Sequence, residues 1–171
     1  EASVDGITVT IVANQLTAPG GTPAITQLTG DVTAGPGSGS VAATLAADYK
    51  LRSIGISMST PGTPLTTGIK GTGVYIPYDC TILYAAIGAD QPGNLVMDIW
   101  IAPFPASYPP VDANSITAGN EPDTAGNDFY EDSTLTGWDV TIDAGSWVYW
   151  NIDSNDVIEE ATLQLVVAVT L

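Results

Sequence analysis

The 171-residue sequence contains no histidine, one cysteine and three basic residues against nineteen acidic ones. Without histidine, Ser-His-Asp and Cys-His catalytic arrangements are excluded, and so are zinc sites of the His/Cys type. A single cysteine excludes an intrachain disulfide, and we expect Cys80 to be a small buried residue beside a strand rather than a reactive thiol. We therefore predict a non-enzymatic protein, although nineteen acids leave open a carboxylate pair of the glycosidase kind.

The net charge of −16 excludes further classes of function. Proteins that bind nucleic acids neutralise phosphates with Lys and Arg, so nucleic acid is not an expected partner. Anionic membrane surfaces are disfavoured for the same reason. The sequence has no run of eighteen apolar residues that would predict a membrane span. The negative charge favours solubility, and it also suits sites that collect divalent cations.

What the sequence does contain is typical of β structure: abundant Thr, Val and Ile, with Gly and Pro at short intervals. About seven alternating or strongly apolar stretches follow residue 49, separated by turn residues. This pattern predicts an all-β fold, an antiparallel β-sandwich that is jelly-roll-like, in residues 49–171. The alternating stretches lie at residues 50–59, 69–76, 80–89, 94–101, 138–142, 146–152 and 160–171.

The stretch at residues 94–101 (NLVMDIWI) organises this prediction, because Leu95, Met97, Ile99 and Ile101 share one face of an extended chain. We expect it to form a hairpin with residues 80–89. The apolar strand at residues 160–171 would aggregate as an exposed edge, so we expect it to be central in a sheet or sealed in an oligomer. Residues 102–137 have no sustained period and predict one large surface loop.

Residues 1–48 carry little apolar mass and read as an extended N-terminal β segment for oligomerisation or attachment. Residues 6–12, 24–33 and 41–45 have extended character, and a Gly/Ser-rich spacer occupies residues 35–40. Such a segment is marginal alone and gains stability when copies of it pair. The composition therefore predicts a homo-oligomer.

Residues 25–34 (ITQLTGDVTA), the spacer and residues 40–46 (SVAATLA) together resemble the linker found in many bacteriophage tail-fibre and tail-spike proteins. The remainder resembles domains that follow this linker in phage structural proteins. The stretches concerned are residues 67–71 (TGIKG), 74–81 (VYIPYDCT), 89–100 (ADQPGNLVMDIW), 108–110 (YPP), 114–117 (NSIT) and 133–138 (STLTGW). One departure is acidic: residues 120–123, 127–128 and 131–132 stand where the resemblance leads us to expect a Lys/Ser-rich segment.

This resemblance implies a structural protein of the virion, an extracellular particle. The protein would be a trimeric component of a fibre or tail that attaches to the host surface. Its implied partners are other virion proteins and a host surface glycan or envelope protein. A purely architectural subunit, such as a capsid decoration protein, head fibre or tube subunit, is the alternative. A carbohydrate-binding module of a secreted enzyme is a third hypothesis, which the linker disfavours.

Clustered acids make calcium a possible cofactor, because hard cations prefer carboxylate and carbonyl oxygens. The candidate ligands crowd the long loop: Glu121, Asp123, Asp128, Glu131 and Asp132. The competing interpretation is turn formation and solvated charge, and none of these acids fits the helix-flanked calcium loop.

Aromatic residues of the same loop predict a ligand-binding surface: Phe104, Tyr108, Phe129 and Tyr130. Aromatic faces among polar groups suit sugars or peptides, and the neighbouring prolines would stiffen the surface. An equally good interpretation is that these rings fix the loop to the sandwich.

Overall fold

The computed structural model describes residues 10–12, 15–17, 32–34, 43–45 and 50–170. The chain divides into two compact units, Glu1–Tyr49 and Lys50–Leu171. Within the described residues, no helix is long and apolar enough to span a membrane.

In the first unit, short strands form two antiparallel pairs. β1 (Thr10–Val12) pairs with β2 (Gln15–Thr17), and β3 (Val32–Ala34) pairs with β4 (Ala43–Leu45). These strands fall within or beside three of the extended stretches predicted for this segment. The spacer at residues 35–40 and most of the linker-like residues 25–34 and 40–46 lie outside the described residues.

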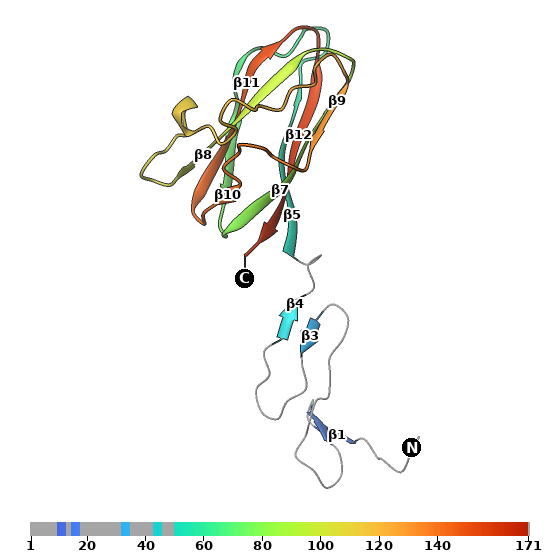
Figure 1. Cartoon of the computed structure of the whole chain (residues 1–171), viewed down its shortest axis with the longest axis vertical. Helices are drawn as coiled ribbons and strands as arrows, with labels where there is room; N and C mark the ends of the chain where they lie inside the picture. The colour runs from blue at the N-terminus through green and yellow to red at the C-terminus, as the bar shows by residue number, and fades with distance from the viewer. Residues whose placement is uncertain (1–9, 13–14, 18–31, 35–42, 46–49, 171) are drawn as a thin grey trace. The chain divides into compact units, whose positions relative to one another are not determined.

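The second unit is a sandwich of two antiparallel sheets, which confirms the predicted all-β antiparallel sandwich (Figure 1). Its five-stranded sheet has the order β10-β7-β12-β5, and β9 pairs with β7 beside β10. Its three-stranded sheet has the order β6-β11-β8. The strands are β5 (Leu51–Ser59), β6 (Gly68–Ile76), β7 (Cys80–Ala89), β8 (Leu95–Pro103), β9 (Phe129–Asp132), β10 (Thr141–Ile142), β11 (Ser146–Asn155) and β12 (Glu160–Val169).

The apolar C-terminal strand is central, as predicted, because β12 lies between β5 and β7. Its inward residues, Leu163, Leu165 and Val167, are fully buried. β11 occupies the corresponding central position between β6 and β8. Each sheet therefore places its most apolar strand where no backbone edge is open.

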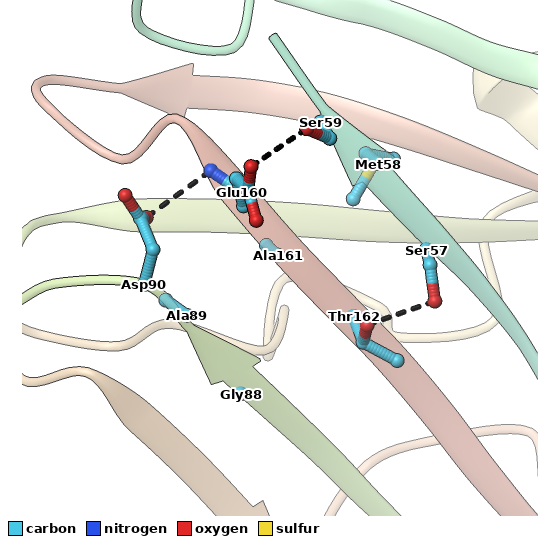
Figure 2. Close-up of a pocket in the computed structure, with 9 residues that line it drawn as sticks. All are labelled: Ser57, Met58, Ser59, Gly88, Ala89, Asp90, Glu160, Ala161 and Thr162. Atoms are coloured by element: carbon cyan, nitrogen blue, oxygen red, sulfur yellow. Dashed lines mark hydrogen bonds between the residues drawn. The ribbon is translucent and has the colours of Figure 1, made fainter. Parts of the chain in front are cut away.

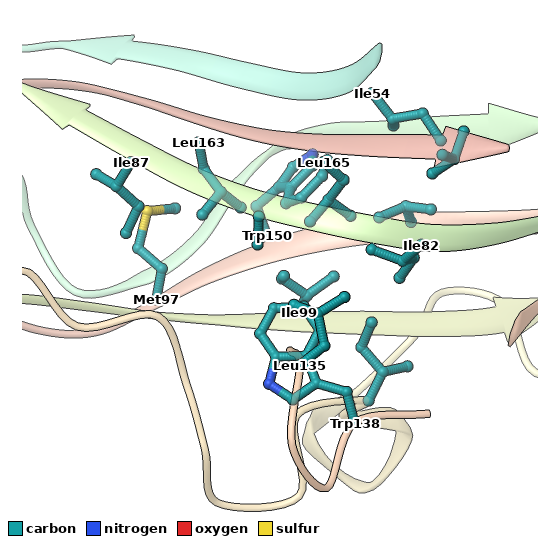
Figure 3. Close-up of a cluster of buried hydrophobic side chains, with 14 of the residues drawn as sticks. Ile54, Ile82, Ile87, Met97, Ile99, Leu135, Trp138, Trp150, Leu163 and Leu165 are labelled. Atoms are coloured by element: carbon teal, nitrogen blue, oxygen red, sulfur yellow. The ribbon is translucent and has the colours of Figure 1, made fainter. Parts of the chain in front are cut away.

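The core fills the layer between the sheets with the side chains that alternation assigned to the inward faces (Figure 3). Trp150 and Met97 of the three-stranded sheet belong to the same buried cluster as Leu165 of the five-stranded sheet. Cys80 is buried as predicted, and burial raises the pKa of its thiol. The thiol is therefore held in its unreactive protonated form.

The predicted hairpin between residues 80–89 and 94–101 is wrong. β7 pairs with β9, β10 and β12, whereas β8 pairs with β11 in the other sheet. The connection crosses between the layers, where Asn94 donates its backbone N–H to Asp156 at 2.8 Å. A side chain at Gly93 would clash with residues 156–158, so this turn packs against a turn from the far end of the chain.

Residues 102–137 are more regular than the predicted loop. They contain a short 3-10 helix, η2 (Asp112–Asn114), and the strand β9. Between them, residues 115–124 run along the open edge of β8, with Ile116 N–H donating to the carbonyl of Ile99 at 3.0 Å. Ile116 and Leu135 are also buried in the core. The segment thus satisfies its backbone groups at a sheet edge, which sequence periodicity does not reveal.

The core assignment predicts unequal effects for two leucines. Leu163→Ala should lower the free energy of unfolding by about 2–5 kcal/mol, because it opens a cavity between the sheets. Leu83→Ala, at a β7 position that is 44% exposed, should cost less than about 1 kcal/mol. Urea denaturation of the full chain measures both, and equal losses would contradict the packing.

Candidate functional site

The outer face of the three-stranded sheet carries the candidate site. Along β11, Val148, Trp150 and Ile152 belong to the core, whereas Trp147, Tyr149 and Asn151 point to the opposite side. In-register partners share a face, so Ala102, Trp100 and Asp98 of β8 lie beside these three residues in turn. This face therefore has an aromatic end, near residue 147, and an acidic end, near residue 151.

The aromatic end, which we call the aromatic face, consists of Tyr75, Phe104, Tyr108, Trp147 and Tyr149. Tyr108 is its hub, with ring centroids 5.4 Å from Phe104, 5.3 Å from Trp147 and 6.2 Å from Tyr149. Tyr75 adds a further ring 5.8 Å from Trp147. The rings meet at angles of 55–79°, the tilted and edge-to-face geometries that aromatic quadrupoles favour.

Three rings of the aromatic face remain about half exposed: Tyr75 at 48%, Phe104 at 54% and Tyr108 at 44%. Tyr149 lies beneath them and donates a hydrogen bond from its hydroxyl to that of Tyr108 at 3.2 Å. This bond raises the pKa of Tyr149, since the proton is held in it. Gly73 has φ +77°, and a Cβ there would meet the Tyr149 ring at 2.4 Å, so glycine is required for this packing.

At the acidic end, the buried carboxylate of Asp98 joins the loop to the sheet. Its Oδ2 accepts from the indole N–H of Trp100 at 2.7 Å. Its Oδ1 accepts from the hydroxyls of Ser115 and Thr117 at 2.8 and 2.9 Å, and from the backbone N–H of Ile99. Asp98 is thereby stabilised by four hydrogen bonds despite its burial.

Asp98, Glu121 and Asp153 bring carboxylate oxygens within 4.8 Å of one another, and within the described residues no other such group forms. Desolvation by the surrounding chain raises the pKa of Asp153, as do the negative charges of Asp98, Glu121 and Asp112, while a hydrogen bond from Asn151 opposes the rise. An all-oxygen set suits a hard cation. However, both oxygens of Asp98 already accept hydrogen bonds, so proximity alone does not identify a metal centre.

The predicted aromatic residues fall into two groups. Phe104 and Tyr108 lie together in the aromatic face. Phe129 and Tyr130 lie on β9, which pairs with β7 of the other sheet. Phe129 is 57% exposed there, whereas Tyr130 packs against the core and its pKa is raised to about 12 by burial and by Asp132.

The predicted calcium ligands are also separated. Glu121 belongs to the three-carboxylate group, but Asp123 accepts from the N–H of Ala125 in a turn. Asp132 accepts from the N–H and hydroxyl of Thr134 in another turn, and Glu131 accepts from the Tyr84 hydroxyl at 2.7 Å. Asp128 belongs to no carboxylate group of three within the described residues.

Sequence reasoning missed Tyr75, Trp147 and Tyr149 as members of a ligand-binding surface, and Asp98 as a member of an acidic group. It counted Asp153 with Asn155 and Asp156 in a polar cluster near the C-terminus, but it did not bring Asp153 together with Glu121. One signal was available, because residues 147, 149, 151 and 153 alternate with apolar neighbours and are themselves aromatic or polar. What the sequence does not show is that β6 and β8 flank β11 and complete this face.

A second surface feature lies on the outer face of the five-stranded sheet. It is a shallow hollow of about 360 Å³ over β5, β12 and the end of β7 (Figure 2). Four of its polar side chains are bonded in pairs: Ser57 to Thr162, and Ser59 to Glu160, both at 2.9 Å. The hollow contains no aromatic residue, and its polar groups are occupied, so it offers a ligand little.

No family model, curated protein or solved structure matches this chain. The site must therefore be interpreted from its own chemistry.

The hydrogen bonds of Asp98 predict that removing this carboxylate destabilises the fold strongly. Asp98→Ala should lower the free energy of unfolding by about 3 kcal/mol, because buried donors such as the Trp100 indole lose their acceptor. Asp123→Ala, which removes a turn contact at an exposed position, should cost about 1 kcal/mol or less. Chemical denaturation of the two variants compares them, and similar losses would refute the network.

The raised pKa of Asp153 predicts that replacing this residue by asparagine stabilises the chain in a pH-dependent way. The folded state holds the proton more tightly than the unfolded state, so stability is lost as pH rises from about 4 through the raised pKa. Asp153→Asn should therefore stabilise the chain at pH 7 by about 0.5 kcal/mol, a modest gain because water screens this exposed group. The gain should vanish near pH 3.

Thermal unfolding of the native chain and the variant between pH 3 and pH 7 measures this gain. Asp143→Asn, in an exposed turn outside the acidic group, is the control and should show little pH-dependent difference. A gain for Asp153→Asn that is the same at both pH values would rule out charge repulsion as its source.

Proposed function

We propose that this chain is a non-enzymatic structural protein of a bacteriophage virion, a component of a fibre or tail that attaches the particle to the host surface. The proposal starts from the ordered set of tail-fibre-like stretches, residues 25–34 and 40–46, which precede the sandwich. The observation that carries it is the aromatic face: a cluster of half-exposed rings, packed against each other beside a sheet, is typical of recognition surfaces.

Attachment by such a face would be multivalent. The N-terminal unit would bring copies together, and we infer a trimer from the geometry of fibres. Several weak contacts on one particle then gain avidity, because each later contact forms at high effective concentration. The ligand would be a host surface glycan or envelope protein, and the N-terminal unit would contact other virion proteins.

The strand order also supports a jelly-roll-like topology. β12 returns to lie beside β5, and β11 returns to lie beside β6, so the last two long strands pair with the first two. The segment at residues 115–124 adds to the edge of β8 in the same way that β9 adds to β7. Each sheet thus contains strands from the first half and from the second half of residues 50–171, as the sheets of jelly rolls do.

The alternative is an architectural virion subunit without a receptor, such as a capsid decoration protein, head fibre or tube subunit. The outer face of the five-stranded sheet favours this hypothesis, because small residues such as Gly55 and Ser57 of β5 would let a neighbouring subunit approach its strands closely. The two hypotheses differ in where the chain lies in the particle, on the tail or on the capsid, and in whether it takes part in adsorption to the host cell.

Antibodies against the full chain distinguish them. In purified particles of the phage that encodes the chain, we expect gold labelling at the tail, and we expect the antibodies to block adsorption to host cells. Light scattering of the purified full chain should give the mass of a trimer. Labelling on the capsid with adsorption intact would favour the architectural subunit, and unlabelled particles would refute both hypotheses.

A further inference from the structure

From the aromatic face we infer a saccharide-binding site whose ligand is an uncharged or amino-sugar-containing oligosaccharide. The ligand would stack on Tyr108 and Trp147 and extend along β11 towards Asp153. The biological meaning of this inference rests on the proposed attachment function, and it specifies the ligand class and the surface that function would use.

The rings provide the stacking surface. The C–H bonds of a pyranose ring carry small positive charges, and they pack favourably on the negative face of an aromatic ring. Tyr108 is fixed by ring contacts on three sides and by the hydroxyl of Tyr149. A preorganised surface loses little conformational entropy when a ligand binds, so weak stacking energies are retained.

The size of the aromatic face favours a small ligand over a protein. Three half-exposed rings offer roughly 300 Å² in all, given that each aromatic side chain buries 150–250 Å² when fully covered. A stable protein interface needs about 800 Å² on each partner. A few sugar rings would cover this area, to which Ile69 of β6, in register with Asn151 and 50% exposed, adds one apolar side chain.

Hydrogen-bond acceptors continue the surface. Trp147 and Asp153 lie on the same strand six positions apart, a span of about 20 Å. Tyr149 and Asn151 between them are buried, so a chain of several linked pyranose rings would pass over the residues that cover them. Asp153 is exposed, and the carboxylate of Glu121 belongs to the same group of three carboxylates. Carboxylates accept hydrogen bonds from sugar hydroxyls and from ammonium groups, so this end would fix the orientation of a stacked chain.

Charge excludes anionic ligands. Of the three basic residues, Arg52 and Lys50 lie in or beside β5 of the other sheet. Lys70 is in register with Trp150, on the inward side of β6. Within the described residues, therefore, no basic side chain belongs to this face, and phosphorylated, sulfated or carboxylated sugars would meet carboxylates without a compensating charge.

The test uses the full chain on an array of hexasaccharides: maltohexaose, mannohexaose, chitohexaose, a glucosamine hexamer and an anionic guluronate hexamer. We expect retention of a neutral or amino hexamer but not of the guluronate. For the hexamer retained, calorimetry should show about tenfold weaker binding for Tyr108→Ala and about fivefold weaker binding for Phe104→Ala. The matched control Phe129→Ala, equally exposed on the other sheet, should bind within about twofold of the native chain.

Each variant is checked by its melting temperature and by its native mass. Because Phe104 is exposed and contacts only Tyr108 among the ring pairs, Phe104→Ala should fold normally even if Tyr108→Ala does not. The inference is overturned if the chain retains no hexamer or only guluronate, if Phe129→Ala weakens binding as much as Phe104→Ala, or if Phe104→Ala changes the native mass. Antibody labelling of the tail without hexamer binding would leave the proposed attachment function standing and refute only this site.

Discussion

The sandwich depends on burying the apolar faces of two central strands against each other. β11 and β12 each hold the middle of a sheet, and their inward residues, among them Trp150, Leu163 and Leu165, are almost completely removed from water. Neither strand can expose its inward face without losing the largest favourable term in folding. Both central strands need neighbouring strands on each side. The chain therefore crosses from one sheet to the other several times, for example in the turn at residues 90–94 between β7 and β8.

This constraint also determines what the outer faces can do. Because side chains alternate, packing Val148 and Trp150 inward directs Trp147 and Tyr149 outward, where the projecting residues 104–108 meet them. The same strand therefore contributes to the core on one side and to the aromatic face on the other. Tyr108 packs against the rings of β11, and the Asp98 carboxylate holds the adjoining loop by accepting hydrogen bonds from the hydroxyls of Ser115 and Thr117.

Much of the fold could be predicted from local pattern. Alternation grouped the core-facing residues of β8 on one face, and the apolar length of β12 predicted a strand that is central in a sheet or sealed in an oligomer. The pattern failed where structure came from long-range pairing. Residues 115–124 have no strand period, yet they add to the edge of β8, and β7 and β8 are neighbours in sequence without being partners. Of the four aromatic residues predicted to form a binding surface, Phe104 and Tyr108 lie together in one cluster, because they are only four residues apart in the chain.

The sequence by itself determined the β class, the faces of the long strands and the exclusion of chemistry that needs histidine, because these follow from composition and from a period of two. Only the tertiary structure decided which residues share a surface. Tyr75, Tyr108 and Trp147 are far apart in the chain, and their contact depends on which strands flank β11. Likewise, Asp98, Glu121 and Asp153 become neighbours only when the long segment folds back along β8. Sheet order is set by the summed packing of distant strands, and no local stretch of sequence contains it.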